Sequence, residues 1–330
     1  SERTAARRPM RPKKGFAHPS AAPISENFSE FFIFYKFFTI AVDFCEDFCA
    51  PMPYNRKVHK GNEIMPATYA HRKFGREIAA LSGEQFPEIA AHEKAFALGL
   101  HGPDPLFYYK PLKKNDVKKK GDLLHEARAA DFFMAARPVY LARGSRAADR
   151  AYLLGFACHF CLDSVCHGEV ARQMELTGMT HVGVEAAFER ILLKEDGHDP
   201  VKARLATHIS AEKDAVSALA AYCGVTEREA KKAAKAMRFY SDLLRAPGAF
   251  RRGMLRLGLR IAGKYDSIAP MMIPAADTAA ADASNAALRP LYDRAVGKAK
   301  KLLPNLREFL ERGTALDEAF MSNFESEKQI

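Results

Sequence analysis

From residue 65 onward, apolar residues recur every three or four positions, with charged residues between them. Val, Ile and Thr do not alternate with polar residues at period two, so the spacing is typical of amphipathic helices rather than strands. The pattern predicts helices at about 67–82, 86–98, 122–142, 145–172, 181–193, 210–222, 226–246, 249–263, 278–303 and 305–325. The predicted fold class is therefore all-α.

Several predicted helix starts carry their own signals. Ser145 is predicted to be an N-cap, and Thr226 with Glu229 is predicted to form a capping box. Pro304 is predicted to open the last helix, because proline is favoured in the first turn. No internal repeat or low-complexity linker follows residue 65, which predicts a single multi-helix domain over residues 65–330.

Residues 1–64 have a different character. A basic, Pro-rich stretch is followed by an aromatic run that Lys36 interrupts, and no A-x-A cleavage site follows. The run is also too short and too charged for a transmembrane helix. We interpret residues 1–64 as a leader, tag or other non-native extension, largely disordered, with the natural product beginning at Met65. Without a signal peptide we expect a cytoplasmic protein, or one peripheral to the membrane.

Composition narrows the possible partners only partly. The 330 residues are 48% hydrophobic, which is enough for a sizeable core and excludes a mostly disordered protein. The formal net charge of +10 favours anionic partners such as phosphates, lipid headgroups or nucleic acid. A basic surface that serves only solubility is the alternative.

The segment "GFACHFCLDSVCHGE" (155–169) carries the most informative polar pattern. His159, Asp163 and His167 follow one another at steps of four, so they share one helix face. Their surroundings are apolar on all sides, which predicts that this stripe is buried. A buried carboxylate needs a strong partner, and a metal ion flanked by histidines supplies one. The alternatives are a partly exposed polar face or core polar residues satisfied by their neighbours.

Distance along this helix favours more than one ion. His159 and His167 are separated by about 12 Å of helix axis, whereas a Zn–N bond is about 2.1 Å. Each could share an ion with Asp163 between them, which indicates a multinuclear site.

The cysteines are less informative. Three of the six lie within residues 158–166 of one predicted helix, too close for a disulfide framework, so a reducing compartment is the simpler account. Cys158 and Cys161 project away from the polar stripe, as free cysteines that pack like small apolar residues do. No βαβ pattern surrounds this C-x-x-C pair, which argues against a thioredoxin-like redox role.

Further metal-ligand candidates occur in separate segments. They are His71, Asp104, His125, His181 and Glu185. Together with the stripe they make five histidines, two aspartates and one glutamate. At about three protein ligands for each catalytic zinc, this set would serve two or three ions.

These candidates form an ordered series that resembles the zinc-dependent phospholipase C family. The series is His71, Asp104, His125, the H-x-x-x-D motif of His159 and Asp163, then His167, and the H-x-x-x-E motif of His181 and Glu185. The resemblance covers residues 65–185. It implies an all-α fold shared with the fungal single-strand-specific nucleases, two or three zinc ions as cofactors, and hydrolysis of phosphate esters.

The resemblance also implies how the ligands are shared. One zinc would be held by Asp104, His125, His159 and Asp163, a second by His167, His181 and Glu185, and a third by His71, a bridging Asp163 and the family's N-terminal residue.

The family's secreted enzymes mature to an N-terminal Trp, but this chain has no Trp, so Pro66 would take that place if Met65 were removed. His167 also follows Asp163 more closely than is usual in the family. The family role of Asp104 is to orient or deprotonate the attacking water.

Three functions remain open at this point. The first is a phosphodiesterase that acts on phospholipid at a membrane surface. Residues 228–266 are basic and amphipathic, which suits binding to an anionic lipid surface. The alternative for this segment is an ordinary solvated helix that packs its leucine face on the core. The second, less favoured, is a nuclease or phosphomonoesterase with Phe107, Tyr108 and Tyr109 as stacking platforms, unless these line the core. The third is a non-catalytic, metal-stabilised protein that binds an acidic partner. We infer no obligate protein partner.

Overall fold

A computed structural model of the chain describes residues 67–324. The interpretation of residues 1–64 falls outside that range. The α-helices are α2 (Thr68–Ser82), α3 (Pro87–Ala91), α4 (Glu93–Gly99), α5 (Asp116–Glu126), α6 (Ala129–Ala142), α7 (Ala147–Thr177), α8 (His181–Glu195), α9 (Lys213–Cys223), α10 (Glu227–Arg245), α11 (Ala249–Ile261), α12 (Tyr265–Ile268) and α13 (Ala279–Arg312). Three 3₁₀ turns are η1 (Asp104–Tyr108), η2 (Ala269–Met271) and η3 (Glu318–Met321).

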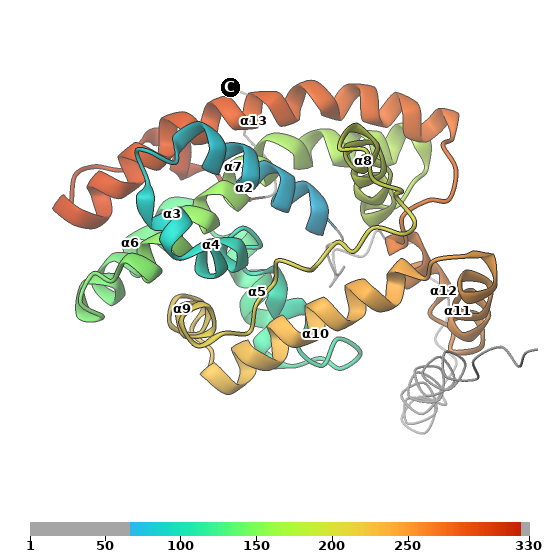
Figure 1. Ribbon diagram of the computed structural model, residues 1–330, viewed down its shortest axis with the longest axis horizontal. Coiled ribbons are helices and arrows are strands. Elements are labelled where there is room, and N and C mark those ends of the chain that lie inside the picture. The colour runs from blue at the N-terminus through green and yellow to red at the C-terminus, as the bar shows by residue number, and fades with distance from the viewer. Residues whose placement is uncertain (1–66, 325–330) are drawn as a thin grey trace, which may run out of the picture. The chain divides into compact units, whose positions relative to one another are not determined.

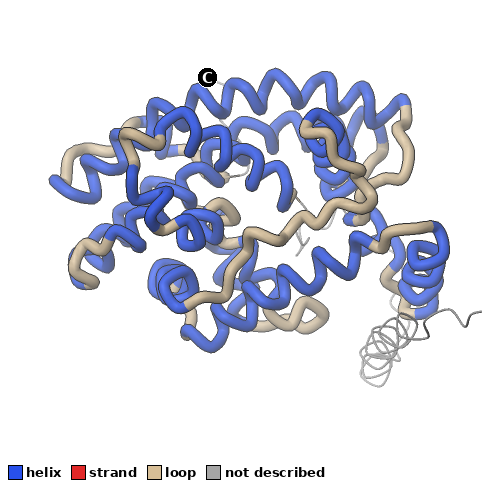
Figure 2. Tube along the Cα trace, in the orientation of Figure 1, coloured by secondary structure: helices blue, strands red, loops and turns tan. Residues whose placement is uncertain are grey.

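The all-α prediction is confirmed: the described residues contain helices and a single isolated β-bridge, and no strand is seen among them (Figure 2). None of the helices in residues 67–324 is long and apolar enough to cross a membrane.

Helix α7 is the centre of the arrangement. It is buried on nearly all sides from Ala148 to Val170, as a helix that is apolar all round must be. The 34-residue α13 runs along it in Figure 1 and packs a row of buried leucines and alanines against it. The polar stripe of α7 therefore lies inside the protein, as its apolar surroundings predicted.

Helix α4 crosses α7 at a contact between two glycines. A Cβ on Gly99 would lie 2.2 Å from the carbonyl oxygen of Tyr152, and a Cβ on Gly155 would lie 2.3 Å from that of Phe96. Only glycine permits such a close approach of two backbones. The contact brings the chain that follows α4, and with it Asp104, close to the middle of α7.

Some predicted helix boundaries are wrong. The predicted helix 122–142 is broken at Ala127 and Arg128, which are extended because the next amide, that of Ala129, donates to the carbonyl of Ser322. The predicted helix 86–98 is likewise divided into α3 and α4, with His92 between them.

Two of the predicted start signals also fail, and one holds. Ser145 has a positive φ of 54° and precedes the true N-cap, Arg146, whose guanidinium binds the buried carboxylate of Asp149. Pro304 lies inside α13 rather than at a helix start, because buried leucines continue on both sides of it. The capping box of Thr226 and Glu229 is confirmed at the start of α10.

The buried cysteines are expected to be unreactive. Burial raises the pKa of Cys158 well above its usual range and that of Cys223 to about 12, and Cys161 is fully buried. Thiols react as thiolates, so these three should resist a disulfide reagent at pH 8 until denaturant is added. Thiol titration of a variant with C45S and C49S checks this, and rapid reaction of two or more of the remaining thiols in the native state would contradict it.

Candidate metal centre

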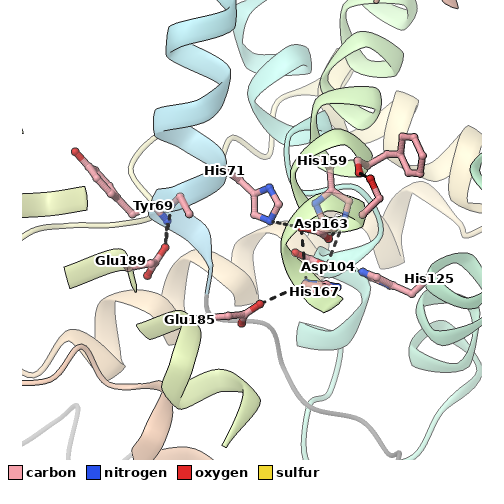
Figure 3. Close-up of polar contacts among 12 residues, drawn as sticks. Tyr69, His71, Asp104, His125, His159, Asp163, His167, Glu185 and Glu189 are labelled. Atoms are coloured by element: carbon pink, nitrogen blue, oxygen red, sulfur yellow. Dashed lines mark hydrogen bonds and ion pairs between the residues drawn. The ribbon is translucent and has the colours of Figure 1, made fainter. Parts of the chain in front are cut away.

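Helix α7 supplies the middle of the site. His159, Asp163 and His167 are all buried along one face of it. One carboxylate oxygen of Asp163 lies 3.0 Å from Nε2 of His159, and the other lies 3.9 Å from Nε2 of His167. Asp163 thus contacts the histidine one turn before it and the histidine one turn after it (Figure 3).

Asp104 and His125 approach from one side. Asp104 begins the turn η1 and His125 lies in the last turn of α5, and Oδ1 of Asp104 is 3.1 Å from Nε2 of His125 and 3.8 Å from Nε2 of His159. The approach needs Gly102, which has a φ of +47° and whose Cβ, if present, would lie 2.3 Å from the ring of His159. The Nδ1 atom of His125 faces the carbonyl of Gly121 at 3.1 Å, which fixes the ring with Nε2 turned inward.

His71 and the pair of His181 and Glu185 come from two further helices. His71 lies in the first turn of α2, with Nε2 3.2 Å from Oδ1 of Asp163. His181 and Glu185 begin α8, and Oε1 of Glu185 is 3.1 Å from Nε2 of His181 and 3.5 Å from Nε2 of His167.

All eight residues predicted as ligands are therefore brought together, in three groups. Within each group one potential ligand atom per residue lies within 4.8 Å of the others. The groups are His71, His159 and Asp163, then Asp104, His125 and His159, and finally His167, His181 and Glu185. His159 and His167 fall in different groups, as expected for two residues separated by two helical turns.

Asp163 and Glu185 are held in their charged form. Burial alone would raise the pKa of Asp163, but the neighbouring histidines His159, His167 and His71 outweigh it and lower that pKa. Burial of Glu185 is likewise outweighed, chiefly by His181, and its pKa falls to about 2. Charged carboxylates are the form that binds cations.

The histidines divide into two kinds. Burial lowers the pKa of His159 to about 4, so it is neutral and can ligate. Burial would also lower the pKa of His125 and His71, but Asp104 raises the first to about 9 and Asp163 raises the second. These two rings therefore carry a proton beside their carboxylates, a proton that a bound cation would displace.

The donor atoms fit a metal ion better than they fit one another. His159 Nε2 and Asp163 Oδ2 are 3.0 Å apart and His125 Nε2 and Asp104 Oδ1 are 3.1 Å apart, yet none of these four buried atoms makes a hydrogen bond of normal geometry. Buried polar atoms that lack a partner are uncommon and call for an explanation such as an ion. Imidazole nitrogens with carboxylate oxygens are ligands typical of zinc.

A comparison with known protein families supports the same chemistry. Residues 70–237 match the family described as zinc dependent phospholipase C. The chain belongs to this family. No curated protein and no solved structure matches the chain. Membership places the chain among zinc-dependent phospholipase C-type hydrolases, and the matched residues include all eight ligand candidates.

Two features of this family member were not predicted from its sequence. Glu189, one turn after Glu185, is fully buried, and its Oε1 accepts hydrogen bonds from the amides of Tyr69 and Ala70 that begin α2. Glu189 therefore fixes the helix turn that carries His71 (Figure 3). The four-residue step from His181 through Glu185 to Glu189 was the signal that could have revealed it.

The second missed feature is a pair of histidines. Nε2 of His101 lies 2.7 Å from Nε2 of His208, and the ring of His101 packs edge-on against His71. Burial lowers the pKa of both histidines, that of His208 to about 3, so one neutral ring donates to the other. The contact ties the connection between α8 and α9 to the rim of the centre.

Replacing Glu189 separates its role as an acceptor from its charge. Burial raises its pKa to about 8, so the carboxyl is largely protonated at neutral pH, and Glu189→Gln keeps both the shape and the acceptor. Glu189→Ala leaves two buried amides unpaired and is expected to lower the free energy of unfolding by about 1–3 kcal/mol, and Glu189→Gln by clearly less. Urea unfolding measures both variants, and equal losses would contradict this assignment.

Proposed function

We propose that this protein hydrolyses phosphodiesters at a centre of two or three zinc ions held by the eight buried residues described above. The observation that supports this proposal most directly is the arrangement of these residues in three adjoining groups. Two of the groups share His159, and Asp163 of the first group lies 3.9 Å from His167 of the third. A cluster of ions suits phosphate chemistry, because several cations can neutralise the attacking, bridging and leaving oxygens together.

The position of each residue suggests a separate role in metal binding or proton transfer. Zinc, when bound, supplies Lewis acidity toward the phosphate oxygens and toward water. Asp163 lies between the groups and would hold two ions at a fixed separation. Asp104 is proposed both to bind an ion and to accept a proton from the attacking water, because its carboxylate lies beside His125 and His159.

A small recess of about 30 Å³ beside the ligand candidates has both polar and apolar walls. It is lined by four of the ligand candidates, His71, Asp163, His167 and Glu185, and by apolar residues that include Leu162, Cys166, Val170, Phe188 and Leu288. A phospholipid, with acyl chains next to its phosphodiester, presents both kinds of surface. We therefore favour a phospholipid as the substrate.

No observation of comparable weight favours a nuclease. Phe107 and Tyr108 are buried, and Phe107 packs its ring against His125 at a centroid distance of 5.3 Å, so these two side chains belong to the core. Bases need exposed aromatic faces for stacking.

A panel of substrates with and without a chelator tests the proposal. The purified protein is expected to hydrolyse a chromogenic phosphocholine ester, to leave single-stranded DNA intact, and to lose activity with a chelator and regain it with zinc. Cleavage of DNA alone would replace the proposal by a nuclease. Zinc-loaded protein without activity on any phosphate ester would indicate a metal-stabilised binding protein instead.

A further inference from the structure

Helix α11 has two opposite faces, and the outer one is apolar. On a helical wheel Phe250, Met254, Leu257 and Ile261 fall within about 60° of one another. Three of them are strongly exposed: Phe250 by 77%, Leu257 by 50% and Ile261 by 71%. Exposed apolar side chains aligned on one helix face, rather than scattered singly, mark an interaction surface.

The inner face of α11 is satisfied by the protein itself. Leu255 and Leu259 are buried, about 130° and about 170° from the centre of the outer stripe. Arg252 is buried as well, and its guanidinium donates to the carbonyl of Ile273. The outer stripe is therefore not the face by which the helix packs on the core.

The charge around the stripe is of one sign. Residues 249–264 contain five basic residues and no acidic one. Arg251 lies about 100° to one side of Phe250 and Arg260 about 80° to the other, and the guanidinium of Arg260 stacks over the ring of Tyr265 at 4.3 Å. An apolar stripe between two arginine flanks is complementary to a surface with an apolar interior and anionic headgroups.

This helix is connected to the metal centre. The chain leads from α11 through α12 to η2, which packs against α8. Pro270 of η2 lies beside Gly183, two residues after His181, so that a Cβ at Gly183 would be 3.9 Å from the proline. His181 is the most exposed of the eight ligand candidates, with 19% of its side chain accessible.

We propose that α11 is a membrane-docking helix, which inserts Phe250, Leu257 and Ile261 into an anionic lipid surface while Arg251 and Arg260 contact headgroups. This role rests on the proposed function, because docking would present the His181 side of the centre to lipid. Binding by α11 can nevertheless be measured without any catalysis.

Sedimentation of the full chain with sucrose-loaded vesicles tests the docking helix. One set of vesicles contains phosphatidylglycerol in phosphatidylcholine, and the other is pure phosphatidylcholine. The protein is expected to partition onto the anionic vesicles, and F250S/I261S should lower the partition coefficient roughly tenfold or more. R251Q/R260Q should lower it on anionic vesicles alone, roughly fivefold for each arginine.

The matched control is Leu176→Ser. Leu176 is 65% exposed at the end of α7, but it lies among Glu169, Arg172 and Glu175 rather than among arginines alone. This control should bind vesicles like the unmodified protein. The unmodified protein and all three variants should hydrolyse a water-soluble phosphocholine ester at the same rate. If the unmodified protein does not hydrolyse this ester, the proposed function is contradicted, whereas vesicle binding still tests the docking helix.

Two results would overturn the docking helix. One is equal vesicle binding by the unmodified protein and F250S/I261S. The other is that neither protein binds vesicles, while light scattering shows the unmodified protein to be a dimer and F250S/I261S to be a monomer. That result would assign the apolar stripe to contact with a second copy of the chain.

Discussion

Asp163→Ala is expected to abolish hydrolysis, lowering turnover by roughly three orders of magnitude or more, and to remove at least one zinc ion per chain. The reason is its position: its two oxygens face His71 and His167 on one side and His159 on the other. Removing that carboxylate leaves the buried, protonated His71 without its counter-charge and removes the ligand that lies between the groups.

Ser164→Ala is the matched control for this variant. Ser164 is the next residue of α7 and equally buried, but its hydroxyl donates to the carbonyl of Phe160 and accepts from Lys298 rather than facing the ligands. Zinc content and turnover should survive in Ser164→Ala. Circular dichroism should show both variants to be helical, and an Asp163→Ala protein with full zinc and full activity would remove Asp163 from the centre.

Asp104→Asn is expected to lower turnover roughly 10²- to 10⁴-fold while most of the zinc stays bound. Oδ1 of Asp104 lies 3.1 Å from Nε2 of His125 and 3.8 Å from Nε2 of His159, and the asparagine side chain keeps an oxygen that can take this position. An amide cannot, however, accept a proton from a water molecule as a carboxylate does. The two roles proposed for Asp104 are thereby separated.

Turnover and zinc content measured on the same sample decide this case. Asp116→Asn is the control, because Asp116 is exposed in the first turn of α5, the helix that carries His125. It should change neither quantity. If zinc is lost from Asp104→Asn in proportion to activity, Asp104 is only a ligand and the proton is accepted elsewhere.

The identity of the ligand candidates could be predicted from sequence because two of the motifs are local. A four-residue step places His159 with Asp163, and His181 with Glu185, on one helix face whatever the rest of the chain does. Burial of the α7 stripe could be predicted too, because its neighbours are apolar on every side.

The grouping of the ligands could not be predicted from spacing in the same way. Asp104 reaches His159 only because α4 and α7 touch at Gly99 and Gly155 and because Gly102 adopts a positive φ. These are contacts between distant segments, which no local periodicity encodes. Glu189 continues the four-residue step of His181 and Glu185, but its role could not be predicted, since its partners are backbone amides at the start of the distant helix α2.

The wrong boundaries have the same origin. Pro304 is a start signal by local preference, but the packing of α13 along α7 continues past it. The break at Ala127 is made by a distant partner, the carbonyl of Ser322, rather than by a breaking residue. In both places tertiary contacts decided against the local signal.

We expect the three groups of ligand candidates to bind zinc. Anomalous diffraction from crystals of the protein at the zinc absorption edge tests this expectation most directly, because it reports both the element and its position. At least two peaks are expected, one among His167, His181 and Glu185 and another among Asp104, His125 and His159. The absence of a zinc peak from both groups in protein that hydrolyses a phosphocholine ester would contradict this expectation.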